Sequence, residues 1–229
     1  MKNYFAKPTP NESIFGLIYF LLQLLVVPGI LVSVNLMLPV PMSEALLNFI
    51  CFAINFVAVL VIFRKFLIAN LAPVKEAPWY VLRWAGIGFL IYMAGNTVFG
   101  FLVPMIDPDF ANINDAAIAE MVDSNYTLMT IGTVILVPVA EECFYRGLIF
   151  RGIYDKSPVW AYVVSMVLFS LAHVAGYVIM ADFGTLVLCF FQYLPAAFAL
   201  AWSYRKSGSL FAPVLIHMTV NQAGMLFMR

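Results

Sequence analysis

The stretch Tyr126–Phe150, YTLMTIGTVILVPVAEECFYRGLIF, combines the length and apolar character of a membrane-spanning helix with three charged side chains, Glu141, Glu142 and Arg146. About 20 consecutive apolar residues are enough for a helix to cross the hydrocarbon core of a bilayer. Charged side chains within such a helix are costly to insert, so they mark a candidate functional site. We therefore predict a membrane protein whose function depends on this segment.

The rest of the chain is also strongly apolar. It is 64% hydrophobic and 10% charged, whereas a soluble domain is about 25% charged. We predict an all-α fold, a polytopic transmembrane helical bundle of about seven spans. The expected spans are Ile14 to Leu38, Ala45 to Ile68, Tyr80 to Pro104, Tyr126 to Phe150, Val159 to Met180, Phe183 to Tyr204, and Ser209 to Met228.

The polar gaps between these stretches are short and carry turn residues, as at Ala72-Pro-Val-Lys. The longest gap, around Asp107 to Asn125, is acidic and is expected to hold a short surface helix. The apolar stretch after Lys2 and Lys7 is too long for the apolar core of a signal peptide, so we expect a retained anchor. We predict one membrane domain, with a three-span region at 1–125 and a four-span catalytic core at 126–229.

The distribution of charge supports seven spans and predicts their orientation. Loops on the cytoplasmic side of a membrane are enriched in Lys and Arg. With seven alternating spans, all Lys and Arg residues except Arg229 fall on the side of the N-terminus. The opposite side receives Asp107, Asp109, Asp115, Glu120, Asp123 and Asp182. We therefore predict a multi-pass plasma-membrane protein with a cytoplasmic N-terminus. A formal net charge of zero gives no indication of a nucleic-acid partner.

Both histidines of the chain lie in predicted spans. His173 falls in the fifth span and His217 in the seventh, with Asn221 one helical turn further on. At about 1.5 Å of rise per residue, Glu141, His173 and His217 lie roughly 15, 20 and 12 Å from the cytoplasmic boundary. Because these spans alternate in direction and yet bring their polar residues to one layer, we predict one shared site in the cytoplasmic half of the bilayer.

Two carboxylates, two imidazoles and a carboxamide can together activate a water molecule. Glu141 and His173 could take the proton from water, while His217 and Asn221 donate hydrogen bonds to the tetrahedral intermediate. Glu141, His173 and His217 could instead bind zinc, because a catalytic zinc needs only three protein ligands. The residues alone leave open whether the protein uses zinc or no cofactor.

Some of these residues also allow two other interpretations. Glu142 and Arg146 are four residues apart on one helix face, so they can form a structural ion pair, but this leaves Glu141 unexplained. Ser170 near His173, or Cys143 beside Glu142, could act as a nucleophile. That mechanism is less favoured, because adjacency on a helix does not give the geometry of a nucleophile, a base and an orienting group.

Three motifs in this order resemble those of the bacterial CPBP family, also called Abi or CAAX-protease-like, which is related to the eukaryotic prenyl-protein endopeptidase. They are Glu-Glu-x-x-x-Arg at 141–146, followed by Gly147, then Phe-x-x-x-His at 169–173 and His-x-x-x-Asn at 217–221. The resemblance covers about the last hundred residues. It implies that Glu141 and His173 activate water, that Glu142 and Arg146 support the site, and that His217 and Asn221 stabilise the oxyanion.

From these observations we expect an intramembrane endopeptidase that cleaves a membrane-associated peptide or protein precursor. If the protein is bacterial, peptide maturation or bacteriocin self-immunity is more plausible than processing of prenylated tails. One alternative is a non-catalytic membrane scaffold or immunity protein that acts by binding a partner. Another is a small transporter or proton relay, although the sequence shows no inverted repeat.

Overall fold

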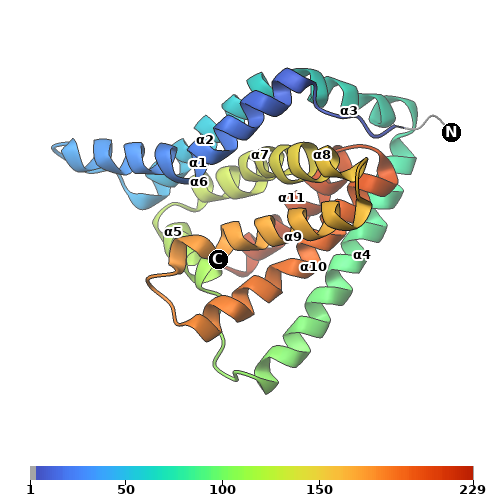
Figure 1. The fold of residues 1–229 in the computed structure, drawn as a ribbon. Helices are drawn as coiled ribbons and strands as arrows, with labels where there is room; N and C mark the ends of the chain where they lie inside the picture. The colour runs from blue at the N-terminus through green and yellow to red at the C-terminus, as the bar shows by residue number, and fades with distance from the viewer. Residues whose placement is uncertain (1–3, 229) are drawn as a thin grey trace.

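The computed structural model describes residues 4–228, which form a bundle of helices without any strand (Figure 1). The first half of the chain contains α1 (Pro10–Met37), α2 (Glu44–Ile62), α3 (Arg64–Glu76), α4 (Pro78–Leu102), η1 (Val103–Met105) and α5 (Ile113–Ser124). The second half contains α6 (Tyr126–Thr130), η2 (Ile131–Leu136), α7 (Val137–Glu142), η3 (Cys143–Phe150), α8 (Arg151–Tyr154), α9 (Pro158–Val174), η4 (Ala175–Tyr177), α10 (Phe183–Ser207) and α11 (Phe211–Phe227). The predicted all-α fold is confirmed.

Six helices are long and apolar enough to cross a membrane. They are Pro10–Met37, Glu44–Ile62, Pro78–Met105, Tyr126–Tyr154, Pro158–Tyr177 and Phe183–Ser207. The predicted seventh span is a shorter apolar helix of 17 residues, α11. Large apolar side chains cover the outside of the bundle, such as Leu25, which is 79% exposed. Such an outer surface suits contact with lipid rather than water.

The helix Tyr126–Tyr154 is continuous but changes its winding along its length. It runs from α6 to α8 and includes two π-helical segments, η2 and η3. Pro138 lies at the start of α7, between these segments. Wider π turns inside helices are often found at functional sites, and this helix carries Glu141, Glu142 and Arg146.

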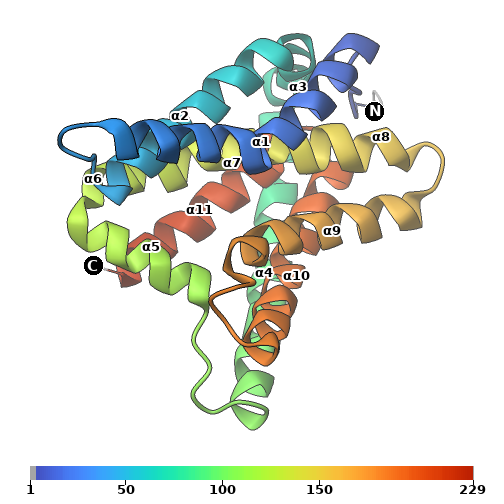
Figure 2. The same ribbon diagram turned by 60° about the vertical axis from the view of Figure 1, so that its left-hand side comes forward.

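The helices that follow pack around the buried side of this long helix. Helix α10 contacts α4, α9 and α11, while the α1–α2 hairpin packs against η2, α7 and η3 (Figures 1 and 2). Aromatic side chains fill the centre, among them the buried Phe66, Phe144 and Phe169. The core therefore joins the first three spans to the four that carry the predicted site.

The second predicted span was wrong at its C-terminal end. It was expected to reach Ile68, but α2 ends at Ile62 and a separate helix, α3, begins at Arg64. The Glu12 carboxylate explains this break, because its Oε1 accepts the backbone N–H of Phe66 at 2.8 Å.

The turn predicted at Ala72–Lys75 is also wrong, because these residues belong to α3. Helix α3 is held to the start of α11 by Asn70, whose Oδ1 accepts the N–H of Leu210 at 2.8 Å. The surface helix predicted in the acidic connection is confirmed as α5.

Candidate active site

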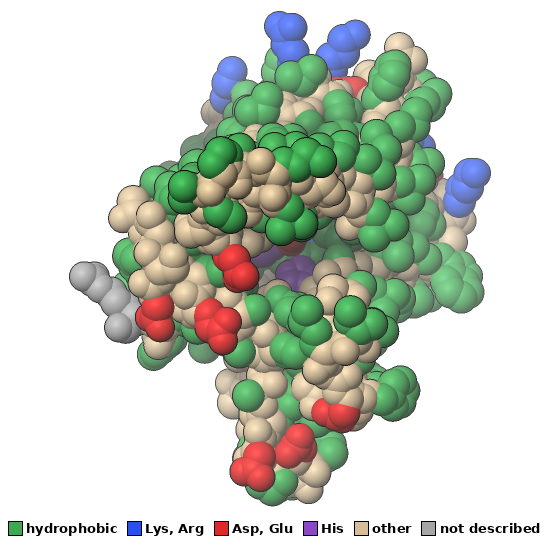
Figure 3. Space-filling view, turned by 90° about the vertical axis from the view of Figure 1, so that its left-hand side faces the viewer, with side chains coloured by type: hydrophobic (Ala, Val, Ile, Leu, Met, Phe, Trp, Pro, Cys, Tyr) green, Lys and Arg blue, Asp and Glu red, His purple; other side chains and the backbone are tan. Residues whose placement is uncertain are grey.

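One cavity of about 790 Å³ collects side chains from both halves of the chain. Glu141, His173, His217 and Asn221 all line it. They come from the helix Tyr126–Tyr154, from α9 and from α11. Figure 3 shows the histidines at the bottom of a hollow in the molecular surface. Among the predicted site residues, only Glu142 and Arg146 do not line this cavity.

Glu142 and Arg146 form a fully buried ion pair behind the cavity wall. Arg146 Nη1 donates to Glu142 Oε1 at 3.0 Å, and both side chains are 0% exposed. The guanidinium also donates from Nη2 to the carbonyl of Ala197 at 3.2 Å and lies 4.5 Å from the ring centre of Phe169. The ion pair predicted from the four-residue spacing is therefore present.

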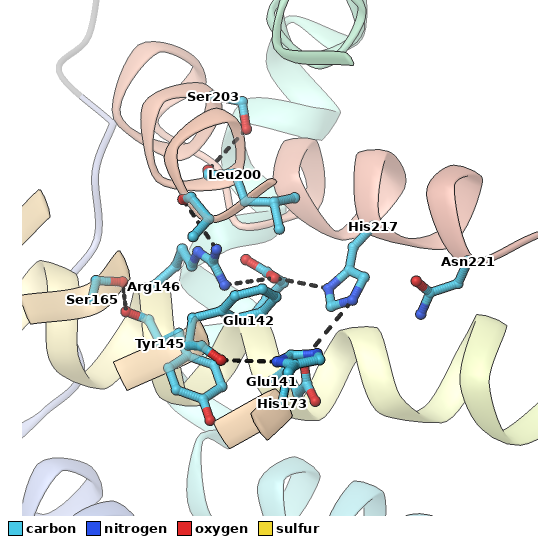
Figure 4. A network of polar contacts seen from close by, with 12 residues as sticks. Glu141, Glu142, Tyr145, Arg146, Ser165, His173, Leu200, Ser203, His217 and Asn221 are labelled. Carbon is cyan, nitrogen blue, oxygen red and sulfur yellow. Dashed lines mark hydrogen bonds and ion pairs between the residues drawn. The ribbon is translucent and has the colours of Figure 1, made fainter. Parts of the chain in front are cut away.

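His217 links this buried pair to the cavity (Figure 4). Its Nδ1 lies 3.0 Å from Glu142 Oε1, the oxygen that also binds Arg146. Its Nε2 lies 3.9 Å from Glu141 Oε2, which is too long for a hydrogen bond. A carboxylate can only accept, so Nδ1 of His217 carries a proton and Nε2 is directed toward Glu141.

His173 is held by its own helix and by two aromatic rings. Its Nδ1 lies 2.8 Å from the carbonyl oxygen of Phe169. Because a carbonyl accepts only, Nδ1 is the protonated nitrogen, and Nε2 of the neutral ring can accept a proton. The imidazole packs against Phe169 and Tyr193, with ring centres 4.5 and 4.3 Å apart respectively.

Asn221 donates a hydrogen bond to a backbone carbonyl that has no donor within the long helix. Its Nδ2 donates to the carbonyl of Thr133 at 2.7 Å. The N–H of Val137 donates to Gly132 instead, and Pro138, the next residue, has no N–H. Asn221 is thereby fixed at the cavity wall with one amide hydrogen and its oxygen left for other partners.

Several buried polar atoms of the site have no hydrogen-bonding partner among residues 4–228. They include Glu141 Oε2, Glu142 Oε2 and Arg146 Nε. The Glu141 side chain is 25% exposed, whereas Glu142 is 0% exposed. Glu141 lines the cavity with the exposed part of its side chain, although its Oε2 is buried, so the two adjacent glutamates lie in different environments.

The possible zinc ligands of the site do not lie together. Within residues 4–228, no three His, Cys, Asp or Glu side chains lie close enough together to hold a metal ion. Glu141, His173 and His217 share the cavity but do not form such a group. The present arrangement therefore does not fit a three-ligand zinc site.

Cys143 and Ser170, the less favoured nucleophiles, are buried and do not line the cavity. Both are 0% exposed. Burial away from the cavity gives a substrate in it no access to either side chain.

Sequence analysis missed three contributors to the site. Pro138 and Tyr193 lie inside apolar stretches. A proline or a tyrosine in such a stretch does not by itself indicate a functional site. Asp115 lines the cavity from α5, although it had been counted only as a charge of the acidic connection. A signal for Pro138 exists in hindsight, because proline inside a helix leaves a carbonyl without its donor.

Residues 123–223 match the model of a family described as type II CAAX prenyl endopeptidase Rce1-like. The matched region contains all six predicted site residues, so the resemblance inferred from the three motifs is confirmed. The fold and this match together define the class: a polytopic helical membrane protein whose residues 123–223 are similar to CAAX-type peptidases.

Two curated proteins are similar to the chain. It is 26% identical over 149 residues to "Putative membrane peptidase YdiL" of Bacillus subtilis (strain 168), covering 64% of this chain and 56% of that protein. It is 32% identical over 90 residues to "UPF0177 protein YxdF" of Lactococcus lactis subsp. lactis (strain IL1403), covering 39% of this chain and 44% of that protein. The chain thus spans about half the length of these relatives. No solved structure matches the chain.

Proposed function

We propose that this protein is an intramembrane endopeptidase that hydrolyses a peptide bond with a water molecule activated by Glu141 and His173. The observation that carries this proposal is that Glu141, His173, His217 and Asn221 line one cavity. The family match and the name of the Bacillus subtilis relative support a peptidase in a membrane setting.

Water activation falls to the two groups with free acceptors at the cavity. The carboxylate of Glu141 lines the cavity on a side chain that is 25% exposed, and His173 Nε2 can accept because Nδ1 is held by Phe169. A carboxylate and an imidazole that share a water can remove its proton as it attacks the peptide carbonyl. The proton then passes to the amine that leaves when the C–N bond breaks.

Stabilisation of the oxyanion falls to His217 and Asn221. Nδ1 of His217 donates to Glu142, so Nε2 can donate as well only when the ring is an imidazolium. A protonated His217 also balances the charges of Glu141, Glu142 and Arg146. Asn221 has a second amide hydrogen beside the one bound to Thr133. Preorganised donors of this kind stabilise the charge that develops in the transition state.

The proposed substrate is a membrane-associated peptide or protein precursor. The cavity holds about 790 Å³ and is also lined by carboxamide side chains, such as Gln23, Asn55 and Gln192. A carboxamide offers both a donor and an acceptor, so it can satisfy a peptide group that has left regular secondary structure within the membrane. The protein is proposed to act in the plasma membrane with its N-terminus in the cytoplasm.

The substitution Glu141→Gln tests the proposal most directly. It keeps the shape of the side chain but removes the base, so we expect cleavage to slow by at least about 100-fold, the lower range for general-base catalysis. Purified protein in lipid vesicles would be incubated with a mixture of membrane-inserting peptides, and new peptide termini would be measured by mass spectrometry.

Glu120→Gln is the matched control. Glu120 lies exposed on α5 and does not line the cavity, so this variant should cleave at the wild-type rate. Equal cleavage by Glu141→Gln and the wild type would contradict the mechanism. A wild-type protein that binds peptides without cleaving any of them would favour the non-catalytic scaffold instead.

A further inference from the structure

Tyr193 of α10 is the residue at which the polar contacts of α5 meet the candidate catalytic histidine. Its ring centre lies 4.3 Å from that of His173, with 32° between the ring planes. Its hydroxyl lies at the other end of the side chain, among three residues near the start of α5. The same side chain therefore contacts both the catalytic pocket and a helix outside the candidate spans.

The hydroxyl of Tyr193 is held by several partners. Asn114 Nδ2 donates to it at 3.0 Å, and its own proton is directed toward Asn112 Oδ1 at 3.4 Å or Asp115 Oδ1 at 3.5 Å. Asn112 is itself fixed, because its Oδ1 caps the start of α5 and its Nδ2 donates to Gln192 at 2.7 Å. Burial raises the pKa of Asp115, and the nearby His173 and Tyr193 partly oppose this rise.

The hydrogen bond of His173 does not by itself fix the plane of its imidazole ring. The bond from Nδ1 to the carbonyl of Phe169 selects the tautomer and fixes one atom of the ring. A single hydrogen bond permits the ring to tilt about that atom, so its plane is set by the rings packed against it. Phe169 lies on the same helix as His173, whereas Tyr193 comes from α10. Tyr193 is therefore the contact that ties the orientation of His173 to another helix.

We propose that Tyr193 is a positioning residue for His173, and that Asn112, Asn114 and Asp115 of the α5 segment hold Tyr193 in place. The assembly keeps Nε2 of His173 directed into the cavity. The inference rests on the proposed role of His173 in water activation, and it adds a connection from the acidic α5 segment to the catalytic pocket.

The alternative is that Tyr193 only docks α5 onto the bundle. Tyr177 provides a matched comparison, because its hydroxyl donates to the same Asn114, at 3.2 Å. Among the described residues, the ring of Tyr177 has no stacking partner, and in particular it is not stacked on His173. Tyr193→Phe removes the hydroxyl that three residues of the α5 segment contact, whereas Tyr177→Phe removes one bond to Asn114 Oδ1 and leaves the contacts of the Tyr193 hydroxyl in place.

The test uses the fact that the chain contains two histidines. Protein labelled with ¹³C and ¹⁵N in histidine, and purified through a tag without histidine, should give one set of imidazole signals for His173 and one for His217. We expect Tyr193→Phe to shift or broaden the His173 signals and to leave those of His217 in place. Tyr177→Phe should leave both sets unchanged, and the His217 signals report that each variant is folded.

Cleavage supplies the second measurement. Partial loss of orientation should lower kcat of Tyr193→Phe about tenfold, a fraction of the roughly 100-fold or larger effect of an acid or base group, with KM changed less than twofold. The proposal is overturned if Tyr193→Phe leaves the His173 signals or kcat unchanged, or if Tyr177→Phe has the same effects. The NMR measurement needs no substrate, so absence of cleavage by the wild type would count against the proposed function and not against the positioning of His173.

Discussion

Glu141 and Glu142 are neighbours of identical type, and their surroundings separate their roles. Glu142 is enclosed with Arg146 and His217, while Glu141 faces the cavity. The sequence predicted the Glu142–Arg146 pair because four residues bring two side chains to one helix face. It could not predict that Asn221 would bind the carbonyl of Thr133, because that contact depends on how α11 lies against a π-helical turn.

The buried ion pair should matter strongly for stability. In Arg146→Met, the Glu142 carboxylate stays buried without its guanidinium, a loss that costs about 3–5 kcal/mol in free energy of unfolding. We expect a clearly lower thermal midpoint in detergent micelles. Lys156→Met is the control, since Lys156 is exposed on the loop before α9 and should change the midpoint little. A midpoint of Arg146→Met equal to that of the control would show that Glu142 is not charged in the folded protein.

At the scale of elements, the apolar stretches predicted the helices well and the breaks between them poorly. The spans follow from runs of apolar residues, which need only local information. The break at Phe63 depends instead on Glu12, far away in the chain, whose carboxylate accepts the N–H of Phe66. Helix α3 was missed for this reason, although its mixed composition could have separated it from the apolar α2.

The contact between α3 and the site helix depends on Gly147, the glycine that follows the first motif. A Cβ at this position would lie 2.7 Å from Cε1 of Phe66, a ring that is 1% exposed. We therefore expect Gly147→Ala to lower the free energy of unfolding by about 1–3 kcal/mol through overpacking. Gly152, on the same long helix, would place a Cβ in open space.

Gly152→Ala should therefore have the opposite effect, a gain of about 0.5–1 kcal/mol from the higher helix propensity of alanine. Denaturation of both variants in the same detergent would measure the difference. If both changes stabilised the protein, α3 would have to be free to move away from the helix Tyr126–Tyr154. That result would contradict the close contact between Gly147 and Phe66.

At the scale of the whole molecule, the cavity is lined by more helices than the three that carry the motifs. The sequence predicted that residues of three spans would meet, and they line one cavity. It did not predict that α1, α2, α4 and α5 would also line that cavity, because nothing in an apolar run tells which face is turned inward. The division of the chain into 1–125 and 126–229 remains a prediction, even though the family match begins at residue 123.

The separation of charge over the surface also belongs to the whole molecule, and it predicts how the protein sits in the membrane. In Figure 3, most of the Lys and Arg side chains in view lie toward one end, while most of the Asp and Glu side chains lie around and below the hollow. Positive charge remains in the cytoplasm, whereas acidic residues contribute little to orientation. The end carrying Lys156 should therefore face the cytoplasm, and the end carrying Asp109 should face outward.

Cysteine labelling can measure this orientation. In a variant without Cys51, Cys143 and Cys189, single cysteines would be placed by Asp109→Cys and Lys156→Cys, both at exposed positions. A membrane-impermeant maleimide should label Asp109→Cys in intact cells and label Lys156→Cys only after the cells are opened. Because one candidate span lies between these two positions, they should be labelled from opposite sides of the membrane. The reverse pattern would invert the protein and place the acidic residues around the hollow in the cytoplasm. Labelling of both cysteines in intact cells would instead mean that the helix Tyr126–Tyr154, the one candidate span between them, does not cross the membrane with Glu141.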